Sequence, residues 1–340
     1  MKNDRYSRQS LFSPIGEQGQ KKLASKHVLI IGAGALGTGT AEGLVRAGVG
    51  KLTIVDRDYV EWSNLQRQQL YVEEDARNSI PKAIAAKKRL KEINSEVDIL
   101  AHIVDVTPLE LKELVQGVDL ILDATDNFDA RMMINDISQK ESIPWIYGAC
   151  VGSYGIFFTV LPKVTPCLRC MLEKIPLGSA TCDTAGIISS AVTMVVSYQL
   201  TEALKILVED KKSLRQKLVF FDVWKNENSE LDVSAMKKVD CLSCGETATH
   251  PALQFNHQMK TSVLCGRECV QIRPSRNEKR DLQQVAAALK GQGEQVEINP
   301  YLLSFSVNTH RLVLFQDGRV LVHGTKEIAK ARSLYYRYLG

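Results

Sequence analysis

Residues 27–148 alternate short apolar, β-branched runs with longer stretches of helical periodicity. This alternation is typical of βαβ units, in which helices join parallel strands. The apolar runs predict strands at 27–31, 52–55, 97–103, 118–122 and 145–147. The periodic stretches predict helices near 35–48, 80–94, 107–116 and 127–141. Most of these strands are apolar throughout, which indicates that helices cover both faces of a parallel sheet.

Beyond Cys150 the pattern changes, and residues 152–160 suit an antiparallel strand. A loop from about 173 to 185 has few apolar anchors and is expected to be mobile. The stretch 187–200 contains five polar residues and falls short of the roughly 20 residues of a bilayer span. It therefore predicts a buried helix at about 186–208, which a strand at 218–222 follows.

A turn-rich segment near 246–260 predicts a boundary between two domains, 1–250 and 251–340. The second domain has the pattern β-α-β-β-β-α, with a hairpin turn at Asp317-Gly318. The predicted fold class is α/β. We expect a Rossmann-like, doubly wound mixed sheet, whose parallel half is followed by antiparallel strands, and a small C-terminal α+β domain.

Composition narrows the functional classes. The chain has 340 residues, 44% hydrophobic and 24% charged, which is ordinary for a globular protein. Its net charge of +4 is spread among interspersed acids and bases, so no nucleic-acid partner is expected. The N-terminus has no apolar leader and no stretch suits a membrane, so a cytoplasmic protein is expected. In a reducing compartment, eight cysteines point to metal binding or thiol chemistry rather than disulfides.

A glycine-rich turn directly follows the first predicted strand and opens a helix. Gly32, Gly34 and Gly37 permit a tight turn and the close approach of a pyrophosphate to the helix N-terminus. Asp56 ends the next strand, where a carboxylate can accept hydrogen bonds from ribose hydroxyls and disfavours a 2′-phosphate. The pattern predicts ATP or NAD, and an NAD-dependent oxidoreductase is the natural alternative.

Further polar residues favour nucleotidyl transfer over hydride transfer. They lie near predicted strand ends or in the first turns of the helices that follow, where open α/β sheets bind ligands. His27 and His102 lie at or within strands and are interpreted as structural, which leaves no proton relay for a dehydrogenase. Two cations and a carboxylate suit a triphosphate with Mg²⁺. The candidates are Asp58, Asn64, Arg67, Gln68, Lys82 and Asp126.

Two Cys-x-x-Cys pairs, Cys167/Cys170 and Cys241/Cys244, supply four thiolates. Each pair can chelate from one tight turn, and together they predict a tetrahedral zinc site. Four thiolates leave no open coordination position, so the expected zinc is structural.

The remaining cysteines divide by position. Cys182 lies in the predicted loop before a long helix, whose N-terminus can lower a thiol pKa, so a nucleophilic role and an inert role both stay open. Cys150 is interpreted as a small buried hydrophobe. A local packing role is favoured for Cys265 and Cys269.

Residues 4–246 resemble the ThiF/MoeB family of sulfur-carrier adenylyltransferases, relatives of the ubiquitin-activating enzymes. The resemblance rests on an ordered set of motifs: Arg5 to Gln9, Gly32 to Gly37, Asp56 to Asp58, Asn64 to Gln68, Pro81-Lys82, Thr125 to Asn127, the two cysteine pairs and Thr181-Cys182. Ala35 departs from the glycine that many relatives have there. The last 80 or so residues contain no rhodanese active-site loop, so sulfurtransferase activity is not expected.

The resemblance implies roles for individual residues. Asp56 and Asp58 would lie at the nucleotide, with Asp56 on the ribose. Arg67 and Lys82 would contact phosphates, and Asp126 would support Mg²⁺. The remaining two candidates are Arg8, which would reach across a homodimer into the neighbouring ATP site, and Cys182, which links covalently to the carrier in some family members.

These expectations combine into one function, the ATP-dependent adenylation of the Gly-Gly carboxylate of a small ubiquitin-like sulfur carrier, which gives an acyl-adenylate and pyrophosphate. Thiol-mediated sulfur transfer from a cysteine desulfurase or another persulfide donor would follow. The carrier would serve thiamine or molybdenum-cofactor synthesis. An NAD-dependent oxidoreductase and a catalytically inactive scaffold of the same fold are the alternatives.

Overall fold

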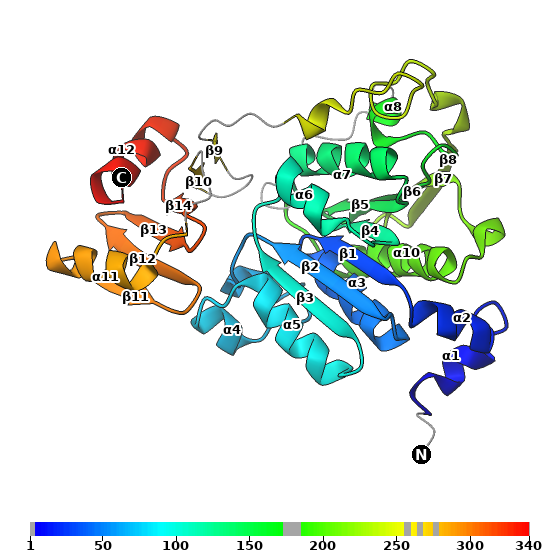
Figure 1. Ribbon diagram of the computed structural model, residues 1–340, viewed down its shortest axis with the longest axis horizontal. Coiled ribbons are helices and arrows are strands. Elements are labelled where there is room, and N and C mark those ends of the chain that lie inside the picture. Colours follow the sequence, from blue (N-terminus) through cyan, green and yellow to red (C-terminus); the bar gives the residue numbers. More distant parts are fainter. Residues whose placement is uncertain (1–3, 173–184, 255–259, 264–267, 275–278, 340) are drawn as a thin grey trace. The chain divides into compact units, whose positions relative to one another are not determined.

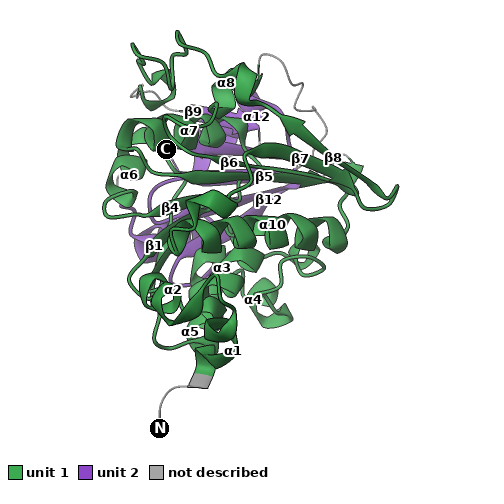
Figure 2. Cartoon of the chain, turned by 90° about the vertical axis from the view of Figure 1, so that its right-hand side faces the viewer, with its two compact units in different colours: residues 1–255 green, residues 256–340 purple. Residues whose placement is uncertain are grey.

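The computed structural model describes residues 4–172, 185–254, 260–263, 268–274 and 279–339. The chain forms two compact units, Met1–Phe255 and Asn256–Gly340, which Figure 2 colours separately. Each unit is built around its own β-sheet. The sequence-predicted Cys182 and most of the predicted 173–185 loop lie outside the described residues.

The first unit contains an eight-stranded sheet in the order β3-β2-β1-β4-β5-β6-β7-β8 (Figure 1). The first five strands of this order are parallel and the last three are antiparallel. This confirms the predicted mixed sheet. The strands are β1 (His27–Ile31), β2 (Lys51–Asp56), β3 (Asp98–Ile103), β4 (Leu120–Asp123), β5 (Trp145–Val151), β6 (Tyr154–Val160), β7 (Lys217–Asp222) and β8 (Glu227–Asp232).

Helices cover both faces of the parallel half. One face packs against α3 (Ala35–Ala47), α5 (Lys82–Ile93) and α10 (Ser189–Leu207), and the other against α6 (Pro108–Leu114) and α7 (Phe128–Glu141). Every residue of β1 is therefore buried, as its continuous apolar sequence predicts. The shorter helices are α1 (Ser7–Leu11), α2 (Gly16–Leu23), α4 (Glu73–Arg77) and α8 (Leu168–Leu172).

Two features of this unit differ from the prediction, since β8 was not predicted and the helix predicted as buried at about 186–208 is buried along one side only. Helix α10 is not buried all round, because Ser189, Ser190, Thr193, Ser197 and Thr201 are exposed along one side. These five positions follow helical spacing, so the polar residues that interrupt the apolar run form a solvent-facing stripe. The apolar side packs on α3 and on the sheet.

The second unit has a six-stranded antiparallel sheet in the order β11-β12-β13-β14-β10-β9. The sequence pattern predicted four strands, two fewer than this sheet contains, and the two edge strands, β9 and β11, contain only four and three residues. The elements are β9 (Lys260–Val263), β10 (Cys269–Arg273), α11 (Leu282–Gly291), β11 (Val296–Ile298), β12 (Leu302–Val307), β13 (His310–Phe315), β14 (Val320–His323) and α12 (Ile328–Tyr338).

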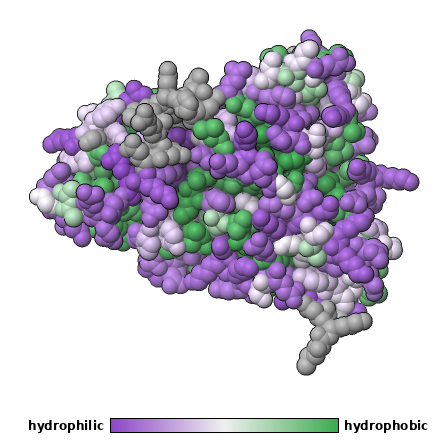
Figure 3. Space-filling view, in the orientation of Figure 1, coloured by the Kyte–Doolittle hydropathy of each residue, from purple (hydrophilic) through white to green (hydrophobic). Residues whose placement is uncertain are grey.

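Hydrophilic side chains predominate on the face of the molecule in Figure 3, with smaller apolar areas among them. Among the helices in the described ranges, none combines the length and the apolar character that a membrane crossing requires.

Candidate active site and metal centre

The glycine turn lies where the strand order reverses, between β1 and β4. Gly32 has a φ of 100°, and a Cβ there would lie 2.4 Å from the carbonyl oxygen of Ala124. A Cβ on Gly37 would lie 1.9 Å from the carbonyl oxygen of Gly32. At Gly34, by contrast, a Cβ would meet nothing within 4 Å. The outer glycines are thus required by packing, whereas Gly34 faces open space at the edge where such sheets bind ligands.

Asp56 ties the glycine turn to the end of β2. Its Oδ2 accepts a hydrogen bond from the backbone N–H of Ala33 (2.6 Å), and its Oδ1 accepts one from the N–H of Asp58 (2.7 Å). Burial raises the pKa of the Asp56 carboxyl, while the charge of Lys82 opposes that shift. The structure therefore brings Asp56 and the glycine turn together.

Lys82 is the first residue of α5, directly after Pro81, and is almost completely buried. Its Nζ lies 3.6 Å from Oδ2 of Asp58, and its backbone N–H donates to the carbonyl of Asp58. Burying an ammonium group is costly unless it is paired, and the partly buried carboxylate of Asp58 provides that partner. The two residues form one polar cluster behind the glycine turn.

Tyr71 was not predicted to belong to this site. Its buried hydroxyl lies 2.6 Å from the carbonyl oxygen of Ala33 and 3.2 Å from that of Lys82. It therefore joins the glycine turn to the start of α5. No motif surrounds this tyrosine, so the sequence offers no signal for its role beyond its nearness to the Asn64–Gln68 segment.

The segment around Asn64 forms a compact turn. Asn64 is buried, and its carbonyl accepts hydrogen bonds from the N–H groups of Arg67 and Gln68. The Arg67 guanidinium is half-buried and donates to the carbonyl of Ser63 (2.9 Å). Gln68 is buried, and its Oε1 has no hydrogen-bond partner among the described residues. A buried acceptor without a partner is costly, which makes Gln68 a candidate for a hydrogen bond from a ligand.

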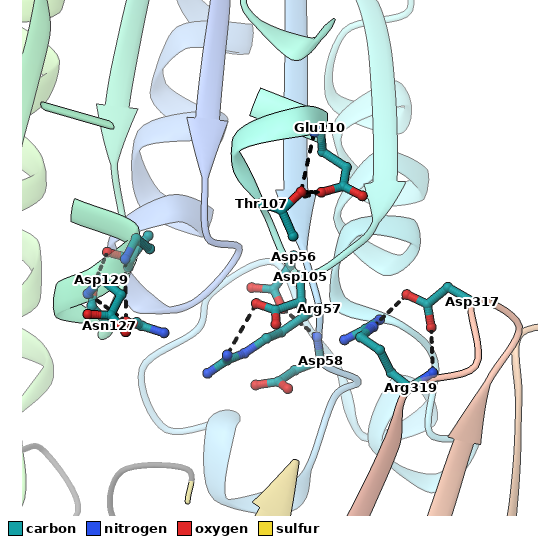
Figure 4. A network of polar contacts seen from close by, with 12 residues as sticks. Asp56, Arg57, Asp58, Asp105, Thr107, Glu110, Asn127, Asp129, Asp317 and Arg319 are labelled. Atoms are coloured by element: carbon teal, nitrogen blue, oxygen red, sulfur yellow. Dashed lines mark hydrogen bonds and ion pairs between the residues drawn. The ribbon is translucent and has the colours of Figure 1, made fainter. Parts of the chain in front are cut away.

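Arg57 is a second residue that the sequence analysis did not single out. Figure 4 shows its side chain directed toward Asp105, and the two ionised groups lie 3.3 Å apart. Burial lowers the pKa of Arg57, but the carboxylates of Asp105, Asp58 and Asp126 raise it by more, so the guanidinium stays charged. A fixed cation thus lies among acidic residues that follow three neighbouring strands, β2, β3 and β4.

The end of β4 supplies a further carboxylate. Asp126 is exposed three residues beyond the strand end, at the same edge of the sheet as the glycine turn. Below it, the fully buried Asp123 accepts hydrogen bonds from the Thr125 N–H (2.9 Å) and from Nε of Arg131 (3.0 Å). Asn127 then caps α7 by accepting from the N–H of Asp129 (Figure 4). These bonds fix the turn that carries Asp126.

Arg8 is not brought together with the other predicted residues. It lies exposed in α1, and the next residue, Gln9, donates to the carbonyl of Ala47 (2.9 Å). Ala47 ends α3, whereas the glycine turn begins that helix, so α1 packs at the opposite end. Within one chain, Arg8 is therefore remote from the nucleotide edge.

The two cysteine pairs converge as the sequence predicts. The four Sγ atoms lie within 4.8 Å of one another and can hold a metal ion. Sulfur–sulfur distances are 3.8 Å for Cys167–Cys170, 3.6 Å for Cys167–Cys241 and 3.5 Å for Cys170–Cys244. A disulfide would require about 2.05 Å. Tetrahedral zinc with bonds of about 2.3 Å spaces its sulfurs about 3.8 Å apart, so the four thiols fit that ion.

Hydrogen bonds from Cys167 and Cys244 lower the pKa of the Cys170 thiol. The hydrogen bond with Cys170 in turn raises the pKa of the Cys167 thiol. Of the other cysteines, Cys150 is only half-buried, although it was predicted to be buried, Cys269 is buried, and Cys265 lies outside the described residues.

The fold is that of an α/β protein. The carboxyl-terminal edge of its parallel strands, which carries the glycine turn, is open as in nucleotide-binding folds, and a separate cluster of four cysteines can hold a metal ion. The model of the ThiF family matches residues 6–243. The chain belongs to the ThiF family.

Two curated relatives and one solved structure illustrate this membership. The chain is 53% identical over 336 residues to the sulfur carrier protein ThiS adenylyltransferase of Bacillus subtilis (strain 168), covering 99% of each protein. It is 35% identical to the sulfur carrier protein adenylyltransferase of Thermus thermophilus, covering 74% of this chain and 93% of the relative. The structure of E. coli MccB with succinimide aligns with a TM-score of 0.63 and 22% identity, over 72% of this chain and 75% of MccB, which supports the fold.

Proposed function

We propose that this chain uses ATP to adenylate the C-terminal Gly-Gly carboxylate of a small ubiquitin-like sulfur-carrier protein. The observation that carries the proposal is the 53% identity, over 99% of the chain, to a ThiS adenylyltransferase. A carrier of the ThiS type is accordingly the first substrate to test. Family membership favours nucleotidyl transfer over the NAD-dependent oxidoreductase and over an inactive scaffold.

The chemical step needs little from the protein. A carrier carboxylate oxygen attacks the α-phosphorus of ATP, the bond to the bridging oxygen breaks, and pyrophosphate leaves with that electron pair. No general base is required, because a carboxylate is already ionised near neutral pH. Catalysis therefore consists of positioning and charge neutralisation.

The residues at the open edge suit those two tasks. Gly34 leaves room for the phosphates at the N-terminus of α3, where backbone N–H groups favour an anion. Lys82 and Arg67 would neutralise phosphate charge, Asp56 and Asp58 would bind the nucleoside side, and Asn64 and Gln68 would orient the ligand. Asp126 would hold Mg²⁺, which supplies further charge neutralisation.

The four cysteines would hold zinc as a structural cross-link between α8 and the turn at 241–244. All four positions of a tetrahedral ion are filled by thiolates, so the zinc would bind no substrate.

A homodimer would complete the site. Arg8 is exposed and remote from the nucleotide edge of its own chain, and the neighbouring Leu11 and Phe12 are 73% and 60% exposed. We propose that α1 packs on a second copy, where Arg8 reaches the partner protomer's phosphates. Mixing inactive Arg8→Ala and Lys82→Ala proteins should restore activity, because the mixed dimer contains one intact site. The absence of restoration after subunit exchange would exclude the shared site.

The carrier would dock beside the antiparallel strands. Strands β5 and β7 end, and β6 begins, at the same edge as the glycine turn. Two aromatic residues are exposed there, Tyr154 at the start of β6 and Trp224 in the β7–β8 turn, with Trp224 78% exposed. Exposed tryptophan and tyrosine are typical anchors of protein interfaces. A tail bound over this edge would enter the nucleotide site.

Carrier-dependent exchange of labelled pyrophosphate into ATP tests the function. Exchange should require a carrier with an intact Gly-Gly terminus and should disappear when the last glycine is removed. A panel of ThiS-like and molybdopterin-type carriers identifies the pathway, and no exchange with any of them would refute the proposal. Replacing Cys182 with serine in a reconstituted system with a cysteine desulfurase tests whether that thiol takes part in sulfur transfer.

A further inference from the structure

A fully buried carboxylate lies beside the cysteine centre. Asp136, in the second half of α7, is 0% exposed. Its Oδ2 accepts a hydrogen bond from the N–H of Ala252 (2.8 Å), and its Oδ1 accepts one from the hydroxyl of Ser243. The guanidinium of Arg169 lies 3.8 Å from Oδ2. Burying an ionised carboxylate is costly unless it is paired and hydrogen-bonded, so the surrounding contacts are what keep Asp136 in the fold.

Two of the residues that contact Asp136 belong to the two cysteine turns, which carry Cys167/Cys170 and Cys241/Cys244. Ser243 immediately precedes Cys244, and Arg169 immediately precedes Cys170. Nε of Arg169 also donates to the Ser243 hydroxyl (2.7 Å), which in turn donates to Asp136. One side chain from each turn is therefore bound to the other turn and to the same carboxylate.

The residue before Asp136 strengthens this link. Asn135 is fully buried, and its Oδ1 accepts a hydrogen bond from the backbone N–H of Leu168 (2.8 Å), directly after Cys167. Its amide nitrogen donates to Asp136 (3.2 Å). Helix α7 thus holds the backbone of the first turn and the side chains of both.

We propose that Asp136 is a positioning residue for the metal centre, which holds the two cysteine turns at ligand spacing through Ser243 and Arg169. The proposal rests on the zinc site in the proposed function. Because the turns are fastened to α7, the four sulfurs are pre-positioned, and binding zinc requires less reorganisation. Groups that orient metal ligands in this way typically contribute about 10–100-fold to metal affinity.

The test measures zinc affinity of the full-length protein by competition with a chromophoric chelator. Ser243→Ala and Asp136→Asn should each weaken zinc binding by about 10–100-fold. Ser138→Ala is the matched control, because Ser138 is also a fully buried serine, on α7 itself, and its hydroxyl donates to the Ile143 carbonyl (2.6 Å) rather than to Asp136. Its affinity should stay within about twofold of the wild type.

Cobalt titration supplies a readout that general destabilisation does not change. The thiolate–cobalt absorption bands of Ser243→Ala should be altered in position or intensity, whereas Ser138→Ala should reproduce the wild-type spectrum.

The outcomes separate the two proposals. A wild-type chain that binds no zinc would refute the metal site, and with it this inference, without touching carrier-dependent exchange. A wild-type chain that binds zinc, together with a Ser243→Ala variant of equal affinity and spectrum, would overturn the positioning role alone. If Asp136→Asn does not fold, the Ser243 variant decides the question.

Discussion

The open edge of the sheet and the cysteine centre are built in opposite ways. At the edge, Gly34 faces empty space, the Gln68 carbonyl oxygen is buried without a partner among the described residues, and Asp126 is exposed. At the cysteine centre, Asp136 and Ser243 are fully buried and hydrogen-bonded to each other. A site that turns over substrate leaves groups for the substrate to satisfy, whereas a structural centre satisfies its groups internally.

The largest effect should come from removing a cation at the open edge. Arg67→Ala should lower carrier-dependent pyrophosphate exchange by about 10²–10³-fold, because one preorganised contact to developing charge is lost. Its described hydrogen bond is to the Ser63 carbonyl, so the melting temperature should change little. Arg77→Ala is the control, since Arg77 is an exposed arginine paired with Glu73 on α4. Near-normal exchange by the Arg67 variant would remove this residue from the mechanism.

Filling the empty space should damage binding without damaging the fold. Gly34 has φ −79° and ψ −152°, which alanine adopts, and its Cβ would contact no protein atom. Gly34→Ala should therefore keep its melting temperature but raise the KM for ATP by a factor on the order of 10–100, because the phosphates are displaced. Gly37→Ala should instead destabilise the protein, since its Cβ would overlap the Gly32 carbonyl. Equal melting losses in both variants would contradict the distinction.

The carrier surface should depend on one exposed aromatic side chain. Trp224→Ala should lower kcat/KM for the carrier by about tenfold, typical of a hot-spot residue, and leave the KM for ATP unchanged. Val239→Ala offers a control, because Val239 is 74% exposed outside the strands that reach the nucleotide edge. An unchanged kcat/KM for the carrier in the Trp224 variant would show that the carrier docks on another surface.

The smallest catalytic effect should come from the cysteine centre. Cys241→Ser removes a buried ligand and should lower the melting temperature by about 5–10 °C as metal affinity falls. Below the transition, the KM for ATP should stay within about twofold of the wild type, because a metal held by four thiolates would bind no substrate. If the folded Cys241 variant lost pyrophosphate exchange, the cysteine centre would take part in catalysis, contrary to the structural role proposed for it.

The sequence was most informative where one physical requirement dominates. The apolar run of β1 requires burial on both faces, and the two Cys-x-x-Cys pairs can converge on a single ion, so both features were predicted correctly. Strand β8, with the sequence Glu-Asn-Ser-Glu-Leu-Asp, was missed because it is a fully exposed edge strand without an apolar face. The strand count of the second unit was too low for a related reason, since short edge strands such as β9 and β11 are defined by pairing more than by composition.

The sequence was least informative about residues whose role depends on distant partners. Arg57 and Tyr71 acquire their roles from Asp105 and from the Ala33 carbonyl, both far away along the chain. Asp136 lies 107 residues before Ser243, and no local pattern links the two. The contacts of Asp136 depend on how α7 packs against the cysteine turns, and the periodicity of the sequence carries no information about that packing.

Under the proposed function, the room for phosphates at Gly34 has a consequence for the stability of the protein in a cell. A ligand that binds the native state alone stabilises it by about 2.7 kcal/mol at one hundred times its dissociation constant. Under the proposed function that ligand is ATP, so the folded fraction of the protein would rise and fall with the energy supply of its host. Starvation would then both slow the enzyme and expose it to proteolysis.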